Sequence, residues 1–165
     1  MVYRIYSEKK PGLDNEARGL LGEARNLLGI ENLEYVRILN RYDVENISAE
    51  LFDRCKTTVF SEPQLDNIYD ALPETDGCVF AVEYLPGQFD QRADSASQCI
   101  QIMAQIKRPT VKSAKVYILG GKISEADVAA IQKYVINPVD SRLASLEDYE
   151  SLEAEVVVPE PVKTV

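Results

Sequence analysis

The polar side chains best suited to chemistry cluster in residues 85–95, which read Leu-Pro-Gly-Gln-Phe-Asp-Gln-Arg-Ala-Asp-Ser. A glycine turn that leads into a helix can present free backbone N–H groups to an anion, and Arg92 could add a charge-assisted hydrogen bond. Asp90 and Asp94 would compete with the anion. The segment therefore predicts first a capped helix with a solvated first turn, then a docking surface for another protein domain, and last a phosphate site. The candidate contact residues are Gln88, Asp90, Gln91, Arg92, Asp94 and Ser95.

The rest of the chain lacks the residues and motifs that enzymes commonly use for catalysis. It has no histidine, which is the commonest general base and metal ligand. Its three cysteines, Cys55, Cys78 and Cys99, form no CxxC pair, and we expect them to be reduced, buried small hydrophobes. No Walker loop, dinucleotide-binding, HExxH or GxSxG motif occurs. The sequence predicts no catalytic residue, no metal site and no cofactor site within this chain.

Charge and length restrict the possible partners. The 165 residues are enough for about one domain with a real core. With 27 acidic and 18 basic side chains the net charge is −9, so nucleic acid and anionic membranes would repel the surface. The sequence contains neither a signal peptide nor an apolar run of the ~18 residues that a membrane-spanning helix needs. We expect a cytoplasmic protein that binds neither nucleic acid nor membrane.

The chain also repeats itself at a displacement of about 76 residues. Pro11-Gly12 corresponds to Pro86-Gly87, and Ile47-Ser48 corresponds to Ile123-Ser124. Between and beyond these pairs, apolar positions match apolar positions over some 45 residues. The pattern indicates two related units, at about 1–73 and 77–148.

Each unit predicts the same run of elements. Strands are expected at 2–7 and 78–84, followed by helices that start after Asp14 and Asp90. The first helix carries an apolar stripe from Leu13 to Leu28 that includes Leu27, and it should stop at Gly29. Further strands are expected at 35–40, extending towards 44, and at 113–119, where Gly120-Gly121 predicts a turn. Short helices capped by Ser48 and Ser124 and extended segments at 65–72 and 139–146 complete the units.

Two successive β-α-β-α-β units indicate an α+β fold. We expect one antiparallel or mixed sheet per unit with helices on one face, and a pseudo-twofold pairing that buries the other face, which would make the chain a covalent dimer. Residues 1–148 form the expected domain. Residues 149–165, rich in acidic residues and proline, predict a linker or tail, and we expect the sequence to be part of a longer chain.

Several stretches resemble the N-terminal domain of large, single-chain phosphoribosylformylglycinamidine synthase. The most specific is Phe80-Ala-Val-Glu-Tyr-Leu-Pro-Gly-Gln-Phe-Asp-Gln-Arg-Ala-Asp-Ser95. Others are Val59–Pro63, Asn40–Val44 and Val135–Val139, so the resemblance extends over residues 1 to about 148.

The resemblance implies a role within a larger enzyme. That family consists of ATP- and magnesium-dependent ligases of purine biosynthesis, which convert formylglycinamide ribonucleotide to the amidine with ammonia released from glutamine. Its N-terminal domain resembles a fused dimer of PurS, a small separate subunit in split versions of the enzyme, and it bridges the synthetase and glutaminase domains. The ATP site and the glutaminase residues belong to later domains, so no catalytic residue is carried over to this chain.

Two classes of function therefore remain. The chain is either a non-catalytic assembly domain whose partners are the synthetase and glutaminase domains, or a self-contained ligand-binding or regulatory module that holds a phosphorylated metabolite at Asp90–Ser95. In isolation, an apolar patch that normally faces other domains could drive formation of a homodimer.

Overall fold

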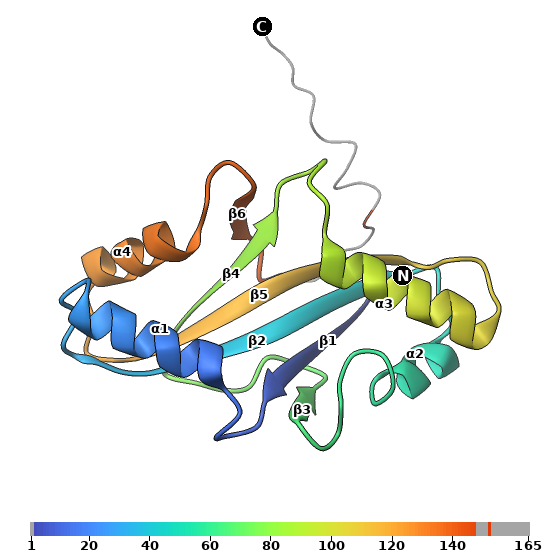
Figure 1. Cartoon of the computed structure of the whole chain (residues 1–165), viewed down its shortest axis with the longest axis horizontal. Coiled ribbons are helices and arrows are strands. Elements are labelled where there is room, and N and C mark those ends of the chain that lie inside the picture. The colour runs from blue at the N-terminus through green and yellow to red at the C-terminus, as the bar shows by residue number, and fades with distance from the viewer. Residues whose placement is uncertain (1, 148–151, 153–165) are drawn as a thin grey trace, which may run out of the picture.

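The computed structural model describes residues 2–147 and Leu152, and these form two successive β-α-β-α-β series (Figure 1). The first series is β1 (Val2–Lys9), α1 (Asn15–Asn26), β2 (Leu33–Glu45), α2 (Ala49–Cys55) and β3 (Asp66–Tyr69). The second is β4 (Cys78–Tyr84), α3 (Gln91–Ala104), β5 (Thr110–Gly121), α4 (Glu125–Val135) and β6 (Ser141–Ala144). Apart from Leu152, the tail expected at 149–165 lies outside the described residues.

All six strands belong to one antiparallel sheet in the order β3-β1-β2-β5-β4-β6. The α+β fold class is thus confirmed. The expectation of a separate sheet in each unit, packed through its free face, is wrong. The reason is that β2 and β5 are longer than expected and pair with each other from Leu33 opposite Gly121 to Glu45 opposite Thr110. Their backbone hydrogen bonds join the two series edge to edge.

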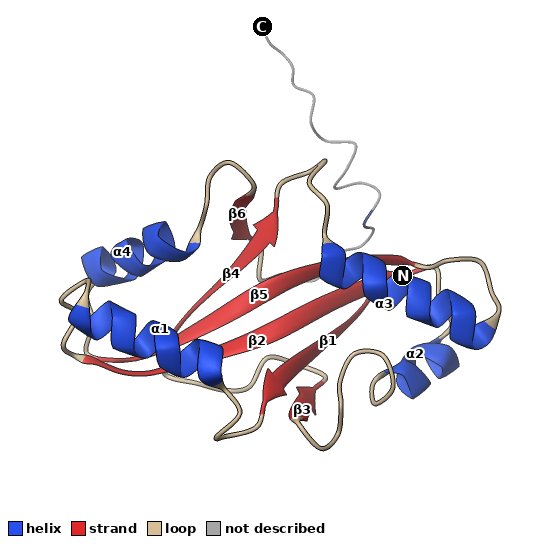
Figure 2. Cartoon of the chain, in the orientation of Figure 1, coloured by secondary structure: helices blue, strands red, loops and turns tan. Residues whose placement is uncertain are grey.

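The helices lie over one face of this sheet, where Figure 2 shows them in front of the strands. Side chains alternate along each strand, so Val36 and Tyr42 of β2 point towards the helices, while Leu39 points to the opposite face. Helix α1 shares its core with α4, through Leu20 and Ile131 among others. Helices α2 and α3 share a second core over the other end of the sheet. Each helical core therefore combines residues from both series.

Helix starts agree well with the sequence. Ser48 accepts the N–H of Leu51, and Ser124 forms a complete capping box with Asp127. Asp90 caps α3 by accepting the N–H of Ala93 at 3.0 Å. Asp14 stands at the N-cap of α1, but its carboxylate accepts the N–H of Gly12 and makes no capping bond to the helix.

Two other expectations need correction. Helical spacing predicts that Leu27 lies on the buried stripe, but it is 71% exposed, although its N–H still bonds the carbonyl of Glu23 as in a helix. Gly120 and Gly121 do not form a turn of their own, since β5 continues through both. Gly120 instead lies against the ring of Tyr35, and a Cβ atom there would meet the ring at 1.8 Å. The glycine is explained by close packing of this ring on the strand.

Candidate functional site

A groove of about 640 Å³ lies on the helix-covered side of the sheet. Its floor comes from β2, β4 and β5, one wall comes from the first turns of α3, and the opposite side comes from the end of α4 and the segment that follows. We call it the central groove, and its lining includes Tyr42, Val82, Tyr84, Gln91, Arg92, Ser95, Cys99, Lys115, Tyr117, Val135, Asn137 and Asp140. Beside it, a second hollow of about 470 Å³ shares Lys115, Tyr117 and Val135 and extends towards α1. The groove is large enough for a small organic ligand.

Two cations line the central groove, and they differ in their partners. Lys115 of β5 forms an ion pair with Glu16 of α1. Arg92 of α3 donates to the hydroxyl of Tyr42 at 3.5 Å, near the limit for a hydrogen bond. Within the described residues no carboxylate forms an ion pair with Arg92. One positive charge in the groove is thus left without a directly bonded anion.

Two groups in the groove have perturbed acidity. Burial is the main cause that raises the pKa of Tyr117 to about 12, and the charge of Glu16 adds to it. Burial alone would lower the pKa of Arg92, but the hydrogen bond and the attraction to Tyr42, with the charges of Glu16 and Asp90, raise it overall. Tyr117 therefore remains a neutral phenol and Arg92 a cation at neutral pH.

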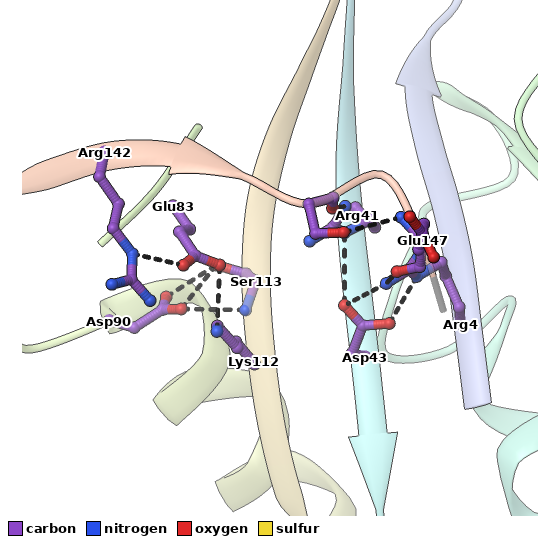
Figure 3. Close-up of polar contacts among 10 residues, drawn as sticks. Arg4, Arg41, Asp43, Glu83, Asp90, Lys112, Ser113, Arg142 and Glu147 are labelled. Atoms are coloured by element: carbon purple, nitrogen blue, oxygen red, sulfur yellow. Dashed lines mark hydrogen bonds and ion pairs between the residues drawn. The ribbon is translucent and has the colours of Figure 1, made fainter. Parts of the chain in front are cut away.

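The opposite face of the sheet carries a second polar region, which is shown in Figure 3. Asp43 of β2 accepts from Arg4 of β1 at 2.6 Å and forms an ion pair with Arg41 at 3.3 Å. The Arg41 and Asp43 side chains are 0% and 1% exposed. On the other side of β5, Glu83 bonds Lys112 and Arg142. Such buried charges are tolerated only because each one is paired.

Two of the three arginines in this region, Arg4 and Arg41, also hold the chain that follows β6. Arg41 donates to the carbonyl of Ser145 at 2.7 Å, and Arg4 donates to the carbonyls of Leu146 and Glu147. We call residues 145–147 the strap, because they cross the sheet from β6 towards β1 (Figure 3). Further along, the N–H of Leu152 donates to Glu45 at 3.0 Å. The charged side chains of Arg4, Arg41 and Asp43 are thus used by contacts within the protein.

The structure separates the six candidate contact residues into two groups. Gln91, Arg92 and Ser95 line the central groove. Gln88 lies in the turn before α3, while Asp94 forms an ion pair with Arg108 outside the groove. Asp90 is occupied structurally, since its carboxylate accepts from Ala93 and from the N–H and hydroxyl of Ser113. These donors are neutral, so Asp90 keeps its negative charge beside Arg92 while its oxygens are used within the protein.

Sequence reasoning missed the residues that complete the groove from other elements. Tyr42, Lys115 and Tyr117 face it from the floor, and Asn137 and Asp140 from the segment after α4. The alternation of apolar and polar residues at 113–119 could have placed Lys115 and Tyr117 on one face of a strand. No sequence signal could have placed that face opposite Arg92.

The cysteines only partly agree with expectation. Cys55 is buried, with a pKa raised chiefly by desolvation. Cys78 and Cys99 are exposed, so the expectation that all three are buried is wrong. Cys99 lies on the outer part of α3 that borders the central groove, where its thiol is accessible to reagents.

Neither protein-family models nor curated proteins contain a match to this sequence. In the described part of the chain, no helix combines the length and apolar character needed to cross a bilayer. The same residues contain no cluster of three or more histidine, cysteine, aspartate or glutamate side chains able to hold a metal ion. The site is thus characterised by its own geometry, which offers a cation, hydroxyl groups and an apolar wall for binding.

Proposed function

We propose that this chain is a non-catalytic assembly domain of a large, single-chain phosphoribosylformylglycinamidine synthase, and that it consists of two PurS-like pseudo-repeats fused into a covalent pseudo-dimer. In this role it binds the synthetase and glutaminase domains of the same enzyme. It supports the transfer of ammonia between them, while ATP and Mg²⁺ are bound elsewhere in the enzyme.

The spacing of the elements supports the pseudo-repeat. β4, α3 and α4 each begin 76 residues after β1, α1 and α2, and β6 begins 75 residues after β3. The strand order β3-β1-β2-β5-β4-β6 is unchanged when the two series are exchanged and the order is read from the other edge.

Equivalent local contacts support it as well. Gly12 and Gly87 occupy matching turns with the same φ of +89°. The N–H of Lys10 bonds the carbonyl of Leu65 at 2.8 Å, and the N–H of Leu85 bonds the carbonyl of Asp140 at 2.8 Å, 75 residues further on in both partners. Their recurrence at one displacement supports the proposal of a duplicated unit.

The observation that carries the assignment to the ligase is the stretch 80–95. In the structure it forms most of β4, the following turn and the start of α3, and it ends at the wall of the central groove. Within it Phe89 is 68% exposed, although it is large and apolar. Phe89 is therefore the residue of this stretch at which a contact with another domain can be tested.

Substitution of that phenylalanine tests the proposal in the ligase that carries this domain. Phe89→Ser should lower glutamine-dependent synthesis several-fold, while synthesis from added ammonia is largely retained, because only transfer between domains is affected. Leu27→Ser, at another large apolar side chain with 71% exposure, is the matched control and should leave both rates unchanged. Equal loss of both activities with Phe89→Ser would contradict the coupling role.

The central groove favours a second candidate function, namely a self-contained ligand-binding or regulatory module. Calorimetric titration of the isolated chain with formylglycinamide ribonucleotide, glutamine and ATP separates the two. Clear saturable binding of any one of them favours the second function. Their failure to bind favours an assembly domain.

A further inference from the structure

We propose that the central groove is a binding site for a small organic anion, with the anionic group held by Arg92 and the Tyr42 hydroxyl and the body of the ligand lying on Val82, Tyr84 and Val135. This inference goes beyond the assembly role and does not depend on it, because it rests only on the groove itself.

Arg92 favours an anionic ligand, because Glu16, Asp90 and Glu83 near the groove are bonded to groups other than Arg92. Glu16 is engaged by Lys115, and Asp90 is engaged by Ser113 and Ala93. Asp140 also lines the groove but forms no ion pair with Arg92. Arg92 is consequently a cation that faces a hollow without a carboxylate of its own.

The surroundings of Arg92 are arranged for recognition as well as for attraction. The Tyr42 hydroxyl lies 3.5 Å from its guanidinium, and the hydroxyl of Ser95 lines the same groove. A carboxylate or a phosphate can accept from the guanidinium and from a neighbouring hydroxyl at the same time, which gives strong charge-assisted hydrogen bonds.

The remaining lining suits an uncharged body. Val82 and Tyr84 come from β4, and Val135 comes from the last turn of α4. Side chains of this kind contribute through the burial of apolar surface. The volume of about 640 Å³ lies in the range of ligand pockets and leaves room for more than an inorganic ion.

Three probes of similar size test the site on the whole chain: benzoate, phenyl phosphate and the neutral benzyl alcohol. Titration followed by nuclear magnetic resonance should show saturable shifts of the Arg92 side-chain N–H and the Tyr42 ring with at least one anion, and much weaker ones with benzyl alcohol. The two anions distinguish a carboxylate ligand from a phosphate ligand. Arg92→Gln should weaken the binding by roughly tenfold or more, since one charge-assisted bond is lost.

Arg25→Gln is the matched control, because it removes the same charge from an exposed position of α1 that does not line the groove. It should leave the affinity within about twofold, an effect of net charge alone at ordinary salt. Either of two results would overturn the proposal: no saturable binding of either anion at millimolar concentration, or equal weakening by Arg25→Gln and Arg92→Gln.

A chemical probe gives a second, independent measurement. Cys99 lines the groove, while Cys78 is exposed elsewhere, so Cys78→Ser allows the reactivity of Cys99 to be measured alone, and Cys99→Ser that of Cys78. For each reagent, the rate of modification of Cys99 is divided by that of Cys78. This ratio should be several times larger for the anionic disulfide dithiobis(nitrobenzoate) than for the uncharged dithiodipyridine. Addition of Arg92→Gln should abolish this preference, and a preference that persists without Arg92 would contradict the proposal. Neither measurement involves the ligase, so failure here leaves the assembly role to be judged by its own test.

Discussion

Both faces of the sheet carry arginine side chains, but these differ in burial and in pairing with carboxylates. On the strap face, Arg41 and Asp43 are almost fully buried, and their polar atoms are used by each other, by Arg4 and by the strap. On the helix face, Arg92 is exposed to the central groove and bonds only weakly to Tyr42. A buried charge must be paired when the protein folds, because an unpaired one loses its hydration without compensation. A solvated charge keeps its hydration and can bind a ligand later. The comparison separates the charges that hold the fold from those that can act on other molecules.

The largest effect is expected when this comparison is broken at Asp43. Asp43→Asn removes the carboxylate that lies between Arg4 and Arg41 and leaves two guanidinium groups close together in a buried place. Loss of one partner of a buried ion pair costs about 3–5 kcal/mol. Urea denaturation measures the change in the free energy of unfolding.

Asp94→Asn is the control for this substitution. It also removes a carboxylate bonded to an arginine at 2.7 Å, but the Asp94 and Arg108 side chains are 41% and 43% exposed. An exposed pair of this kind contributes about 0–1 kcal/mol. Equal destabilisation by the two substitutions would mean that the strap face is hydrated and that its charges are not structural.

Two glycines, Gly120 on the strap face and Gly19 beside the groove, test how tightly each face of the sheet is packed. Gly120→Ala places a methyl group 1.8 Å from the ring of Tyr35 on the strap face, so the ring has to move away from its bond to Thr75. We expect destabilisation by about 1–3 kcal/mol, as for other overpacked sites. Removal of the ring in Tyr35→Ala should make the second substitution, Gly120→Ala, nearly neutral in a double-mutant cycle of thermal or urea denaturation.

Gly19→Ala is the counterpart on the groove side. Gly19 is in the middle of α1, lines the hollow next to the central groove and has nothing within 4 Å of an added Cβ. Alanine should stabilise the protein by about 0.5–1 kcal/mol through helix propensity alone. Destabilisation would indicate that this hollow is closed by contacts of the helix.

Local structure was largely predictable from the sequence, because it is decided by neighbouring residues. The sequence predicts Ser48, Ser124 and Asp90 as helix caps, Asp90 from the Pro-Gly turn before it and Ser124 also from its acidic first turn, and it predicts Gly29 as a helix stop. Each depends on hydrogen bonds or dihedral angles within a few residues. Leu27 shows the limit of this reasoning, since helical spacing places it on the apolar stripe, but the neighbouring residues do not determine whether that end of the stripe is covered.

The arrangement of the sheet and of the groove was not predictable in the same way. Whether two units meet through their faces or their edges depends on how far β2 and β5 extend, and ladder pairing between residues such as Leu39 and Val116 is a contact over long sequence distance. The groove depends on that choice, because it brings Arg92 of one series over Tyr42 of the other. For the same reason, residues 85–95 indicated the right helix start but gave only one wall of the site.

The pH dependence of stability tests the floor of the groove. The pKa of Tyr117 is raised to about 12, first by burial and then by Glu16. An unfolded chain ionises its tyrosines near pH 10, so between about pH 10 and 12 the unfolded state holds fewer protons at this position than the folded state. The free energy of unfolding therefore falls as the pH rises through this range.

Glu16→Gln removes only the second cause, so the pKa of Tyr117 should decrease but remain above 10, because burial persists. Nuclear magnetic resonance titration of the Tyr117 ring measures it directly. A value that returns to that of a free tyrosine would mean that the floor of the groove is open to water, and that the contrast between the two faces lies in hydration as well as in charge.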